Sequence, residues 1–496
     1  MSLALLPVSA SDCTDLLGLK TVAAEITLAE PVGGGAFSPP GGAPIAGLPA
    51  FCRVAATLKP TADSYIRIEV WMPANGWNGR FLGTGNGGLA GRIIYPSLAA
   101  GVRSGYAVAN TDMGTSTPPG SNAAAFIGHP EKWADWGYRA THEMTLVAKR
   151  IVHAFYGRSA QHAYFTGCST GGEQALMEAQ KYPADYDGIV AGGAANNRTR
   201  VHTSILWNFA VAQKEPASAL STAKLATLAN AVLAACDGKD EVRDGWLDDP
   251  RRCEFDPASL ECTGPDNDGC LTKAQVQTVR RIYEGPVNAR TGEQIYPGTP
   301  RGSELGWAGF STPRAAPSAA PYAPIFQWVW GAEWDWRKFD FDRDVATLDA
   351  RLAKTVNATA PDLKQFRKMG HKLIAYHGWA DSLVVPEEAT KYLGSVISRE
   401  RLVDVSTFYR LFMVPGMAHC GGGSGPNSFD ALGAVVDWVE RGIPPEMMVA
   451  TKYVEDNKAK GVAVQRPICA YPLVAVYKGT GSTNDATSFV CAAGKP

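Results

Sequence analysis

The chain has 496 residues, of which 45% are hydrophobic and 19% are charged, and its formal net charge is −1. This balance is typical of a folded enzyme rather than a disordered chain. A near-neutral charge gives no electrostatic reason to expect nucleic acid or an anionic membrane as a partner. No run approaches the roughly 18 apolar residues of a membrane-spanning helix, so we expect no membrane span. The sequence does not indicate the oligomeric state.

The ten cysteines are an even number, and several lie in polar segments that read as loops. Five disulfides are therefore expected, which predicts an oxidising compartment and a secreted or periplasmic protein. The first ten residues lack the positive region of a full signal peptide. Val8-Ser9-Ala10 resembles the end of one, so we interpret the start as mature or truncated.

Strands and helices alternate over the first 200 residues. Apolar periodicity and Gly-rich or polar flanks predict strands at 64–71, 80–83, 106–110, 163–166 and 187–191, and helices at 136–155 and 173–182. Such alternation indicates the α/β class, with a parallel sheet and helices on both faces.

The alternation stops between about 200 and 365, where cysteines, prolines, Asp-rich turns and tryptophans gather. Strands are again predicted at 372–377 and 408–414, followed by a helix at 429–441. The simplest account is one α/β core, residues 1–200 and 366–496, interrupted by a lid insert at 201–365.

Gly167-Cys168-Ser169-Thr170-Gly171 matches the nucleophile elbow G-x-S-x-G. The pattern alone is weak, and a Gly-rich turn without a chemical role is the alternative. A predicted strand enters the motif and a helix leaves it, which is the context that exposes a nucleophilic serine. Ser169 is therefore the candidate nucleophile.

Candidate partners follow in the chain order serine, acid, histidine that α/β-hydrolases use. Asp381 comes just after the strand predicted at 372–377, and His419 lies in a Gly-rich loop after the strand at 408–414. His419 would take the proton of Ser169, and Asp381 would orient the imidazole. His377 is the rival base, although a histidine at a strand end is more often structural.

Two cysteines flank this pair of candidates. If Ser169 and His419 are within hydrogen-bond reach, Cys168 and Cys420 lie within the span that a disulfide bridges. The alternative is two unrelated cysteines. A bridge would also remove the thiolate needed for the competing hypothesis of thiol chemistry at Cys168.

Three motifs together resemble the tannase and feruloyl esterase family: Gly-Cys-Ser-Thr-Gly-Gly, His-Gly-Trp-Ala-Asp and Val-Pro-Gly-Met-Ala-His-Cys. The resemblance runs from about Cys13 to Cys491 and includes Trp77-Asn-Gly-Arg-Phe81. It implies an α/β-hydrolase core, a large lid domain, five disulfides, a structural calcium ion, no organic cofactor, and hydrolysis of esters of aromatic acids. One relative cleaves the mono-ester of terephthalate with a lid arginine, and no arginine aligns clearly here.

An oxyanion hole needs two backbone donors. The first is expected at Thr170, directly after the nucleophile. The resemblance places the second at Gly85, in the loop Gly83-Thr-Gly-Asn-Gly-Gly88. The alternatives are a flexible turn and a phosphate-binding loop, and the latter lacks the following Lys-Ser/Thr.

Acidic residues recur every three or four positions between Cys236 and Asp248, with the oxygen ligands that calcium prefers. The segment is not an EF-hand, and a solvated acidic turn is the alternative. The resemblance implies side-chain ligands Asp237, Asp240 and Asp244 and backbone ligands Val242 and Trp246. Resemblance and spacing also suggest the bridges Cys13–Cys52, Cys236–Cys253, Cys262–Cys270 and Cys469–Cys491.

The leading hypothesis is a serine esterase acting on a small aromatic ester of feruloyl type. Gallate esters, terephthalate mono-esters and a non-catalytic binding protein with the hydrolase fold stay open. Six aromatic residues lie in a short part of the insert, at Phe310, Phe326, Trp328, Trp330, Trp334 and Trp336. We expect Trp328 or Trp330 to contact the substrate ring, and the alternative is that all six form the core of the insert.

Overall fold

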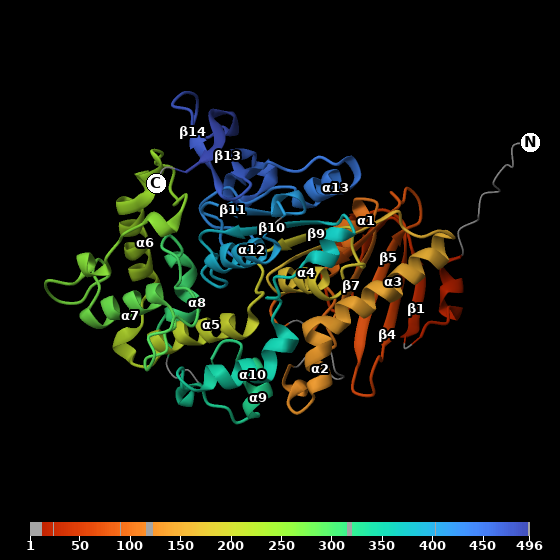
Figure 1. Ribbon diagram of the computed structural model, residues 1–496, viewed down its shortest axis with the longest axis horizontal. Coiled ribbons are helices and arrows are strands. Elements are labelled where there is room, and N and C mark those ends of the chain that lie inside the picture. Colours follow the sequence, from red (N-terminus) through yellow and green to blue (C-terminus); the bar gives the residue numbers. More distant parts are fainter. Residues whose placement is uncertain are drawn as a thin grey trace, which may run out of the picture. The chain divides into compact units, whose positions relative to one another are not determined.

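The computed structural model describes residues 12–22, 24–89, 91–115, 123–314, 320–401 and 403–494 (Figure 1). Val8 to Ala10, which resemble a cleavage site, lie outside the described residues. The chain divides into two compact units, Met1–Ile189 with Leu363–Lys372 and Val190–Asp362 with Leu373–Pro496. The division into a core and a lid at residues 200 and 365 stays a prediction, since the second unit holds both the insert and the strands that follow it.

The first unit contains a six-stranded sheet and a small two-stranded one. In spatial order, the six strands are β1 (Ala24–Val32), β4 (Phe51–Leu58), β5 (Ile66–Pro73), β7 (Ala107–Thr111), β6 (Arg80–Thr84) and β8 (His162–Cys168). The two short strands β2 (Gly35–Phe37) and β3 (Ile45–Leu48) pair with each other.

The sheet is mixed, which corrects the expectation of a parallel sheet. Neighbours among β1, β4, β5 and β7 run antiparallel, whereas β6 is parallel to both β7 and β8. The physical reason is the connection between strands, because a parallel pair needs a long crossover and an antiparallel pair needs only a short loop. No helix separates β4 from β5, whereas helices separate β6 from β7 and β7 from β8.

The helices of the first unit are α1 (Tyr95–Arg103), α2 (Pro130–Ala134), α3 (Ala140–Tyr156), α4 (Thr170–Lys181) and α11 (Lys364–Lys368). Helix α3 packs against β5 and β7 (Figure 1). Met144, Val147, Ile151 and Phe155 recur at helical spacing along α3, and all four are buried.

The second unit begins inside β9 (Gly188–Gly192), which neighbours β10 (Lys372–Gly378), and β10 pairs in parallel with β11 (Tyr409–Val414). In the chain, helix α12 (Glu387–Glu400) follows β10 and helix α13 (Ala431–Arg441) follows β11. Two further pairs of antiparallel strands follow, β12 (Met447–Tyr453) with β13 (Val462–Cys469), and β14 (Leu473–Tyr477) with β15 (Phe489–Ala493).

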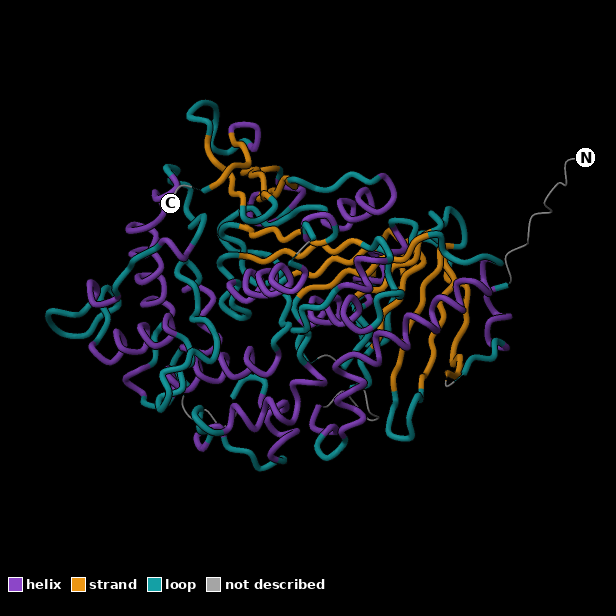
Figure 2. The backbone as a smooth tube through the Cα atoms, in the orientation of Figure 1, coloured by secondary structure: helices purple, strands orange, loops and turns teal. Residues whose placement is uncertain are grey.

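Helices make up the regular structure between β9 and β10 in the part of the chain that the structure describes (Figure 2). They are α5 (Arg198–Gln213), α6 (Thr222–Cys236), α7 (Lys273–Glu284), α8 (Ala308–Ser311), α9 (Ala323–Trp330) and α10 (Asp344–Val356). Leu228, Val232, Val279 and Trp307 lie in one buried apolar cluster of this segment. The insert therefore has a core of its own.

One stretch, Pro216–Asp240, is long and apolar enough to cross a membrane by length and composition alone, which corrects the expectation that no such stretch is present. Leu225, Leu228 and Val232 of this stretch are almost fully buried in the apolar cluster of the insert. Its buried Lys224 forms an ion pair with Asp266. These contacts are those of a core helix.

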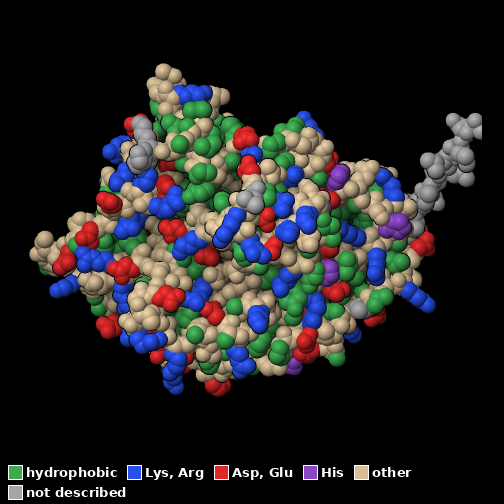
Figure 3. Space-filling view, viewed as in Figure 1, with side chains coloured by type: hydrophobic (Ala, Val, Ile, Leu, Met, Phe, Trp, Pro, Cys, Tyr) green, Lys and Arg blue, Asp and Glu red, His purple; other side chains and the backbone are tan. Residues whose placement is uncertain are grey.

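On the face shown in Figure 3, cationic and anionic side chains are interspersed.

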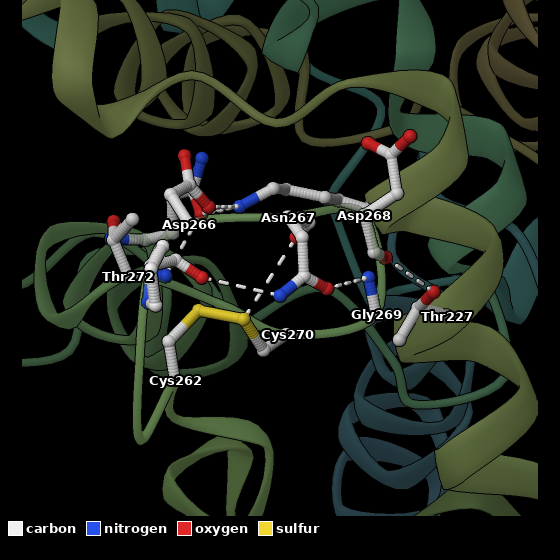
Figure 4. The surroundings of a disulfide bond; sticks show 11 residues. Thr227, Cys262, Asp266, Asn267, Asp268, Gly269, Cys270 and Thr272 are labelled. Atoms are coloured by element: carbon white, nitrogen blue, oxygen red, sulfur yellow. Dashed lines mark hydrogen bonds and ion pairs between the residues drawn. A yellow bond between two sulfur atoms is a disulfide. The ribbon is translucent and has the colours of Figure 1, made fainter.

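Four disulfides have the expected pairing, namely Cys13–Cys52, Cys236–Cys253, Cys262–Cys270 and Cys469–Cys491. Cys168 and Cys420 are also disulfide-bonded, and no cysteine is free. Figure 4 shows the Cys262–Cys270 loop, where Thr227 Oγ1 donates to the Asp268 carbonyl at 2.8 Å. Asp266 lies near both sulfur atoms, but these are bonded to each other and are not thiolate ligands.

Helix α4 carries a fully buried carboxyl group, that of Glu178. Glu178 has no exposed surface, and neither of its carboxyl oxygens has a hydrogen-bond partner. Burial and the neighbouring Asp185 carboxylate raise the pKa of Glu178 well above its ordinary value. Asp185 itself accepts a 2.6 Å contact from His142 Nδ1. Burial and Asp185 therefore favour the neutral form of Glu178 in the folded chain.

We predict that Glu178→Gln stabilises the protein at pH 8, because glutamine does not ionise, by about 1.4 kcal/mol for each unit by which the folded pKa of Glu178 exceeds the unfolded one. The unfolded glutamate ionises around its ordinary pKa, whereas the folded one ionises only at higher pH, so the native state loses stability as pH rises from the unfolded pKa to the folded one. Thermal denaturation at pH 5 and pH 8 should show the larger gain at pH 8. Glu25→Gln, on an exposed position of β1, serves as the control. An equal gain at both pH values would contradict the assignment.

Candidate active site

Ser169 lies in the tight turn between β8 and α4. Its backbone has φ 63° and ψ −116°, a conformation that side-chain-bearing residues rarely adopt. The turn leaves Ser169 partly exposed, while Thr170 behind it is buried. This is the geometry of a nucleophile elbow, which presents a serine hydroxyl at the end of a strand.

Glycines make this turn possible because backbones approach closely around it. A Cβ on Gly167 would lie 2.5 Å from the carbonyl oxygen of Gly171, and one on Gly85 would collide with Gly171 Cα. The loop after β6 is also tied to α4, since Gly171 N–H donates to the Asn86 carbonyl at 2.8 Å. The loop and the elbow therefore hold each other in place.

The expectation for Gly85 as an oxyanion donor does not agree with the structure. Gly85 N–H donates to the Thr166 carbonyl at 2.9 Å, so this amide is already occupied beside β8. The role of Gly85 in the structure is close packing against α4. Thr170 occupies the expected place at the start of α4, and its hydroxyl donates to the Gly88 carbonyl at 2.7 Å.

His419 and Asp381 lie together after adjacent strands of the second unit. His419 Nδ1 is 2.7 Å from Asp381 Oδ2, and the His419 side chain is about a quarter exposed, at 23%. Asp381 is fully buried, and its Oδ1 accepts the backbone N–H groups of Leu383 and Val384 at 2.9 and 3.0 Å. Burial opposes ionisation of Asp381, but His419 and His377 hold its pKa well below the ordinary value.

His377 also contacts this acid but from the buried side. Its Nε2 lies 2.8 Å from the Val384 carbonyl and 3.2 Å from Asp381 Oδ2. A carbonyl accepts only, so Nε2 carries the proton. The side chain is 1% exposed, which matches a structural histidine rather than a catalytic base. Its contact with Asp381 is a feature that the sequence did not reveal.

The loop after β11 crosses the end of β10, and glycine permits this crossing. A Cβ on Gly378 would overlap the Met417 carbonyl, and Ala380 N–H donates to the same oxygen at 3.0 Å. Gly416 has φ 64°, which lets the loop turn sharply. This local packing brings His419 to Asp381.

The acidic segment of the insert forms a cluster of carboxylates. Asp237 accepts backbone N–H groups of Asp244 and Gly245 at 3.2 Å each, and Asp240 accepts that of Val242 at 3.1 Å. Asp244 Oδ2 pairs with Arg466, whereas Asp244 Oδ1 is buried without a partner. Val242 and Trp246, the expected carbonyl ligands, are buried in the same loop.

The pKa values of this cluster report crowding of like charges. Burial, with Asp240 and Asp237 nearby, raises the pKa of Asp244 to about 7 despite the opposing charge of Arg466. Burial and Asp240 likewise raise the pKa of Asp248 to about 7. Asp248 is an addition to the expected set, and its place in the three-to-four-residue acidic repeat is the signal that pointed to it. An oxygen-lined site with an unpartnered carboxylate oxygen fits a divalent cation.

The aromatic residues of the insert pack mostly against one another. Phe326 and Trp334 stack with centroids 4.5 Å apart, and Trp330 meets Phe339 edge to face at 5.7 Å. Trp328 is 3% exposed, which disagrees with its expected contact with a substrate ring. Trp330 is half-buried and retains some free surface.

Comparison with known proteins gives consistent matches over most of the chain. Residues 52–492 match the family model described as "Tannase and feruloyl esterase". The chain is 39% identical to an uncharacterised esterase of Xanthomonas campestris pv. campestris, over 97% of this chain and 91% of the relative. It is 33% identical to a probable feruloyl esterase B-2 of Aspergillus flavus, over 85% of this chain and 83% of the relative.

Solved structures agree with these matches. Feruloyl esterase B from Aspergillus oryzae superposes with a TM-score of 0.87 at 29% identity, covering 97% of this chain and 99% of that one. The tannin acyl hydrolase from Aspergillus niger gives 0.78 at 23% identity over 95% and 92% of the two chains, which shows a shared fold. The α/β-hydrolase fold is therefore confirmed. A match over nearly the whole chain to one family, in sequence as in structure, means that this protein belongs to the tannase and feruloyl esterase family of carboxylic ester hydrolases.

Proposed function

We propose that this chain hydrolyses esters of hydroxycinnamic acids of the feruloyl type, through an acyl-enzyme on Ser169. The observation that carries the proposal is the hydrogen bond between His419 Nδ1 and the buried, ionised Asp381. This bond orients the imidazole and leaves Nε2 as the proton acceptor for a serine. Ser169, in its strained turn, is the matching nucleophile.

The reaction has two balanced steps. Ser169 Oγ attacks the ester carbonyl while His419 Nε2 takes the hydroxyl proton, and the same proton then passes to the departing alcohol. Water next attacks the acyl-serine and gives a proton to His419, which returns it to Ser169 Oγ as the bond to the acyl group breaks and the acid is released. Asp381 keeps its negative charge throughout and stabilises the imidazolium.

The oxyanion of each tetrahedral intermediate needs two N–H donors. Thr170 N–H, at the start of α4, is the first, and the helix dipole there favours negative charge. The second comes from Gly87 or Gly88 in the loop after β6. Asn86 N–H is excluded because it donates to Gln174 Oε1 at 2.8 Å, as is Gly85.

Several relatives favour a feruloyl substrate. Seven of the relatives are named probable feruloyl esterases, at 31% to 33% identity. The tannin acyl hydrolase is less similar, so gallate esters are the second candidate. In this proposal, the segment 201–365 covers the catalytic edge as a lid, and Trp330 contacts the acyl ring.

We further propose a structural calcium ion on the side chains of Asp237, Asp240 and Asp244 and the carbonyls of Val242 and Trp246. The unpartnered Asp244 Oδ1 and the crowded carboxylates support it. The ion would neutralise like charges within the loop that the Cys236–Cys253 disulfide closes. The disulfides also support export to an oxidising compartment, outside the cytoplasm.

The wild-type protein should hydrolyse methyl ferulate faster than methyl gallate or a terephthalate half-ester. Ser169→Ala should lower kcat by at least about 10⁴-fold without changing the melting temperature, since it removes only the nucleophile. Initial rates with each ester, followed by product chromatography, give the measurement. Ser159→Ala, at an exposed position shortly before β8, is the matched control and should keep the wild-type rate. Retained activity in Ser169→Ala would exclude the proposed mechanism.

Substitutions of the two histidines beside Asp381 should have clearly different effects on kcat. His419→Asn should lower kcat on methyl ferulate by about 10³-fold or more, because it removes the base. His377→Gln places an amide N–H near the position of Nε2 and so keeps a donor for the Val384 carbonyl; its kcat should fall less than tenfold while the protein loses stability. Steady-state kinetics and thermal denaturation of both variants test this. The reverse order of the two kcat values would make His377 the base.

Removal of calcium should lower stability and leave the chemical step unchanged. A ligand present at about 100 times its dissociation constant adds about 2.7 kcal/mol to the native state. A chelator should therefore lower the melting temperature of the wild type, and it should have no effect on Asp237→Asn/Asp240→Asn. The initial rate on methyl ferulate well below the melting temperature is the second readout. Immediate loss of activity at unchanged stability would contradict a structural role.

A further inference from the structure

A cavity of about 600 Å³ lies in the insert, at the C-terminal end of α5. Its α5 residues include Trp207 and Val211, and Lys214 follows directly after the helix. Other lining residues come from α7 and from the segments before and after α9. This volume is in the range of cavities that bind small molecules.

Aromatic rings form the walls of this cavity. Trp207 meets Phe341 edge to face at 5.1 Å, and Phe341 meets Phe339 at 5.1 Å in the same manner. Trp207 and Phe341 are half-buried, so their rings have free surface, whereas Phe339 and Trp336 close the cavity from below as buried residues. Rings fixed by edge-to-face contacts can accept another ring by offset stacking.

The rim of the cavity is cationic. Lys214, Arg281, Arg314 and Arg337 line it, against the single carboxylate of Glu215. Arg337 pairs with Asp335 at 3.1 Å, but Lys214 and Arg281 form no ion pair with any residue that the structure describes. The Arg281 guanidinium lies 4.7 Å from the centre of the Trp207 ring. Cations without counter-ions beside aromatic walls favour an anion that carries a ring.

The cavity is separate from the surroundings of the catalytic acid. Val201 and Ile205, nearer the start of α5, pack with Val384, which follows Asp381 in the chain. At about 100° per residue, Trp207 and Val211 are turned on average by about 120° around the helix axis from Val201 and Ile205. Neither Asp381 nor His419 lines the cavity.

We propose that this cavity is a second, non-catalytic binding site for a small aromatic carboxylate. The ring lies against Trp207 and Phe341, and the carboxylate is bound by Lys214 and Arg281. The acid that the proposed reaction releases belongs to this class, so the site binds product outside the catalytic centre. The ligand class follows from the side chains of the cavity, and the site does not depend on which ester is the substrate.

The test distinguishes ferulate binding in the cavity from ferulate binding at Ser169. The full-length protein is first inactivated with an aryl phosphonate at Ser169, which blocks the acyl site, and ferulate binding is then measured by equilibrium dialysis. One ferulate should bind per inactivated chain. Methyl ferulate, which has the ring without the charge, should bind at least about tenfold more weakly, and sodium chloride should weaken ferulate binding.

A double variant and a control variant, both at exposed positions, should leave the fold intact. Lys214→Gln/Arg281→Gln should weaken ferulate binding at least about tenfold, and Arg290→Gln, an exposed arginine outside the cavity, should not change it. Hydrolysis of methyl ferulate by the untreated double variant should stay at the wild-type initial rate, so loss of binding is distinguishable from loss of the proposed function. The proposal is overturned if inactivated enzyme binds no ferulate or if the double variant binds it normally. Equal binding of methyl ferulate, or tighter binding of the neutral oligosaccharide xylohexaose, would also overturn it.

Discussion

The burial of a charged Asp381 is the constraint on which the arrangement of His419 and His377 in the second unit depends. A carboxylate without solvent is unstable unless several donors face it. Here two backbone N–H groups and two histidines supply that environment, and together they keep the pKa of Asp381 low. The acid can then hold His419 in one orientation without taking its proton. Crossing of the His419 loop over Gly378 is the backbone condition for this arrangement.

Ser169, the proposed nucleophile, depends instead on close backbone packing within the first unit. Ser169 adopts a positive φ, and this strain persists because the surrounding backbone leaves no alternative. Gly85, Gly167 and Gly171 pack so closely that a side chain at Gly85 or Gly167 would collide with Gly171. The hydrogen bond from Gly171 to Asn86 then ties the elbow to the loop after β6. The loop therefore positions the serine through close packing.

The insert combines three independent means of holding a mainly helical segment together. It has an apolar cluster around Leu228 and Trp307, two internal disulfides, and a carboxylate cluster that fits a cation. Although most aromatic rings of the insert pack against one another, Trp207 and Phe341 keep part of their surface free. The cationic cavity beside Trp207 is one consequence, since its walls are fixed by packing beneath them.

The sequence by itself determined the periodic elements, the fold class, the positions of Ser169, Asp381 and His419 after their strands, and the pairing of four disulfides. These depend on local patterns, such as helical spacing at Met144 and Ile151 or a glycine-flanked serine, and on motifs shared with a family. Only the tertiary structure decided that the sheet is mixed, that Gly85 N–H bonds to Thr166, that Trp328 is buried and that His377 contacts Asp381. The reason is physical: a residue's hydrogen-bond partners and exposed surface are set by segments that lie far from it in the chain, and no local pattern encodes them.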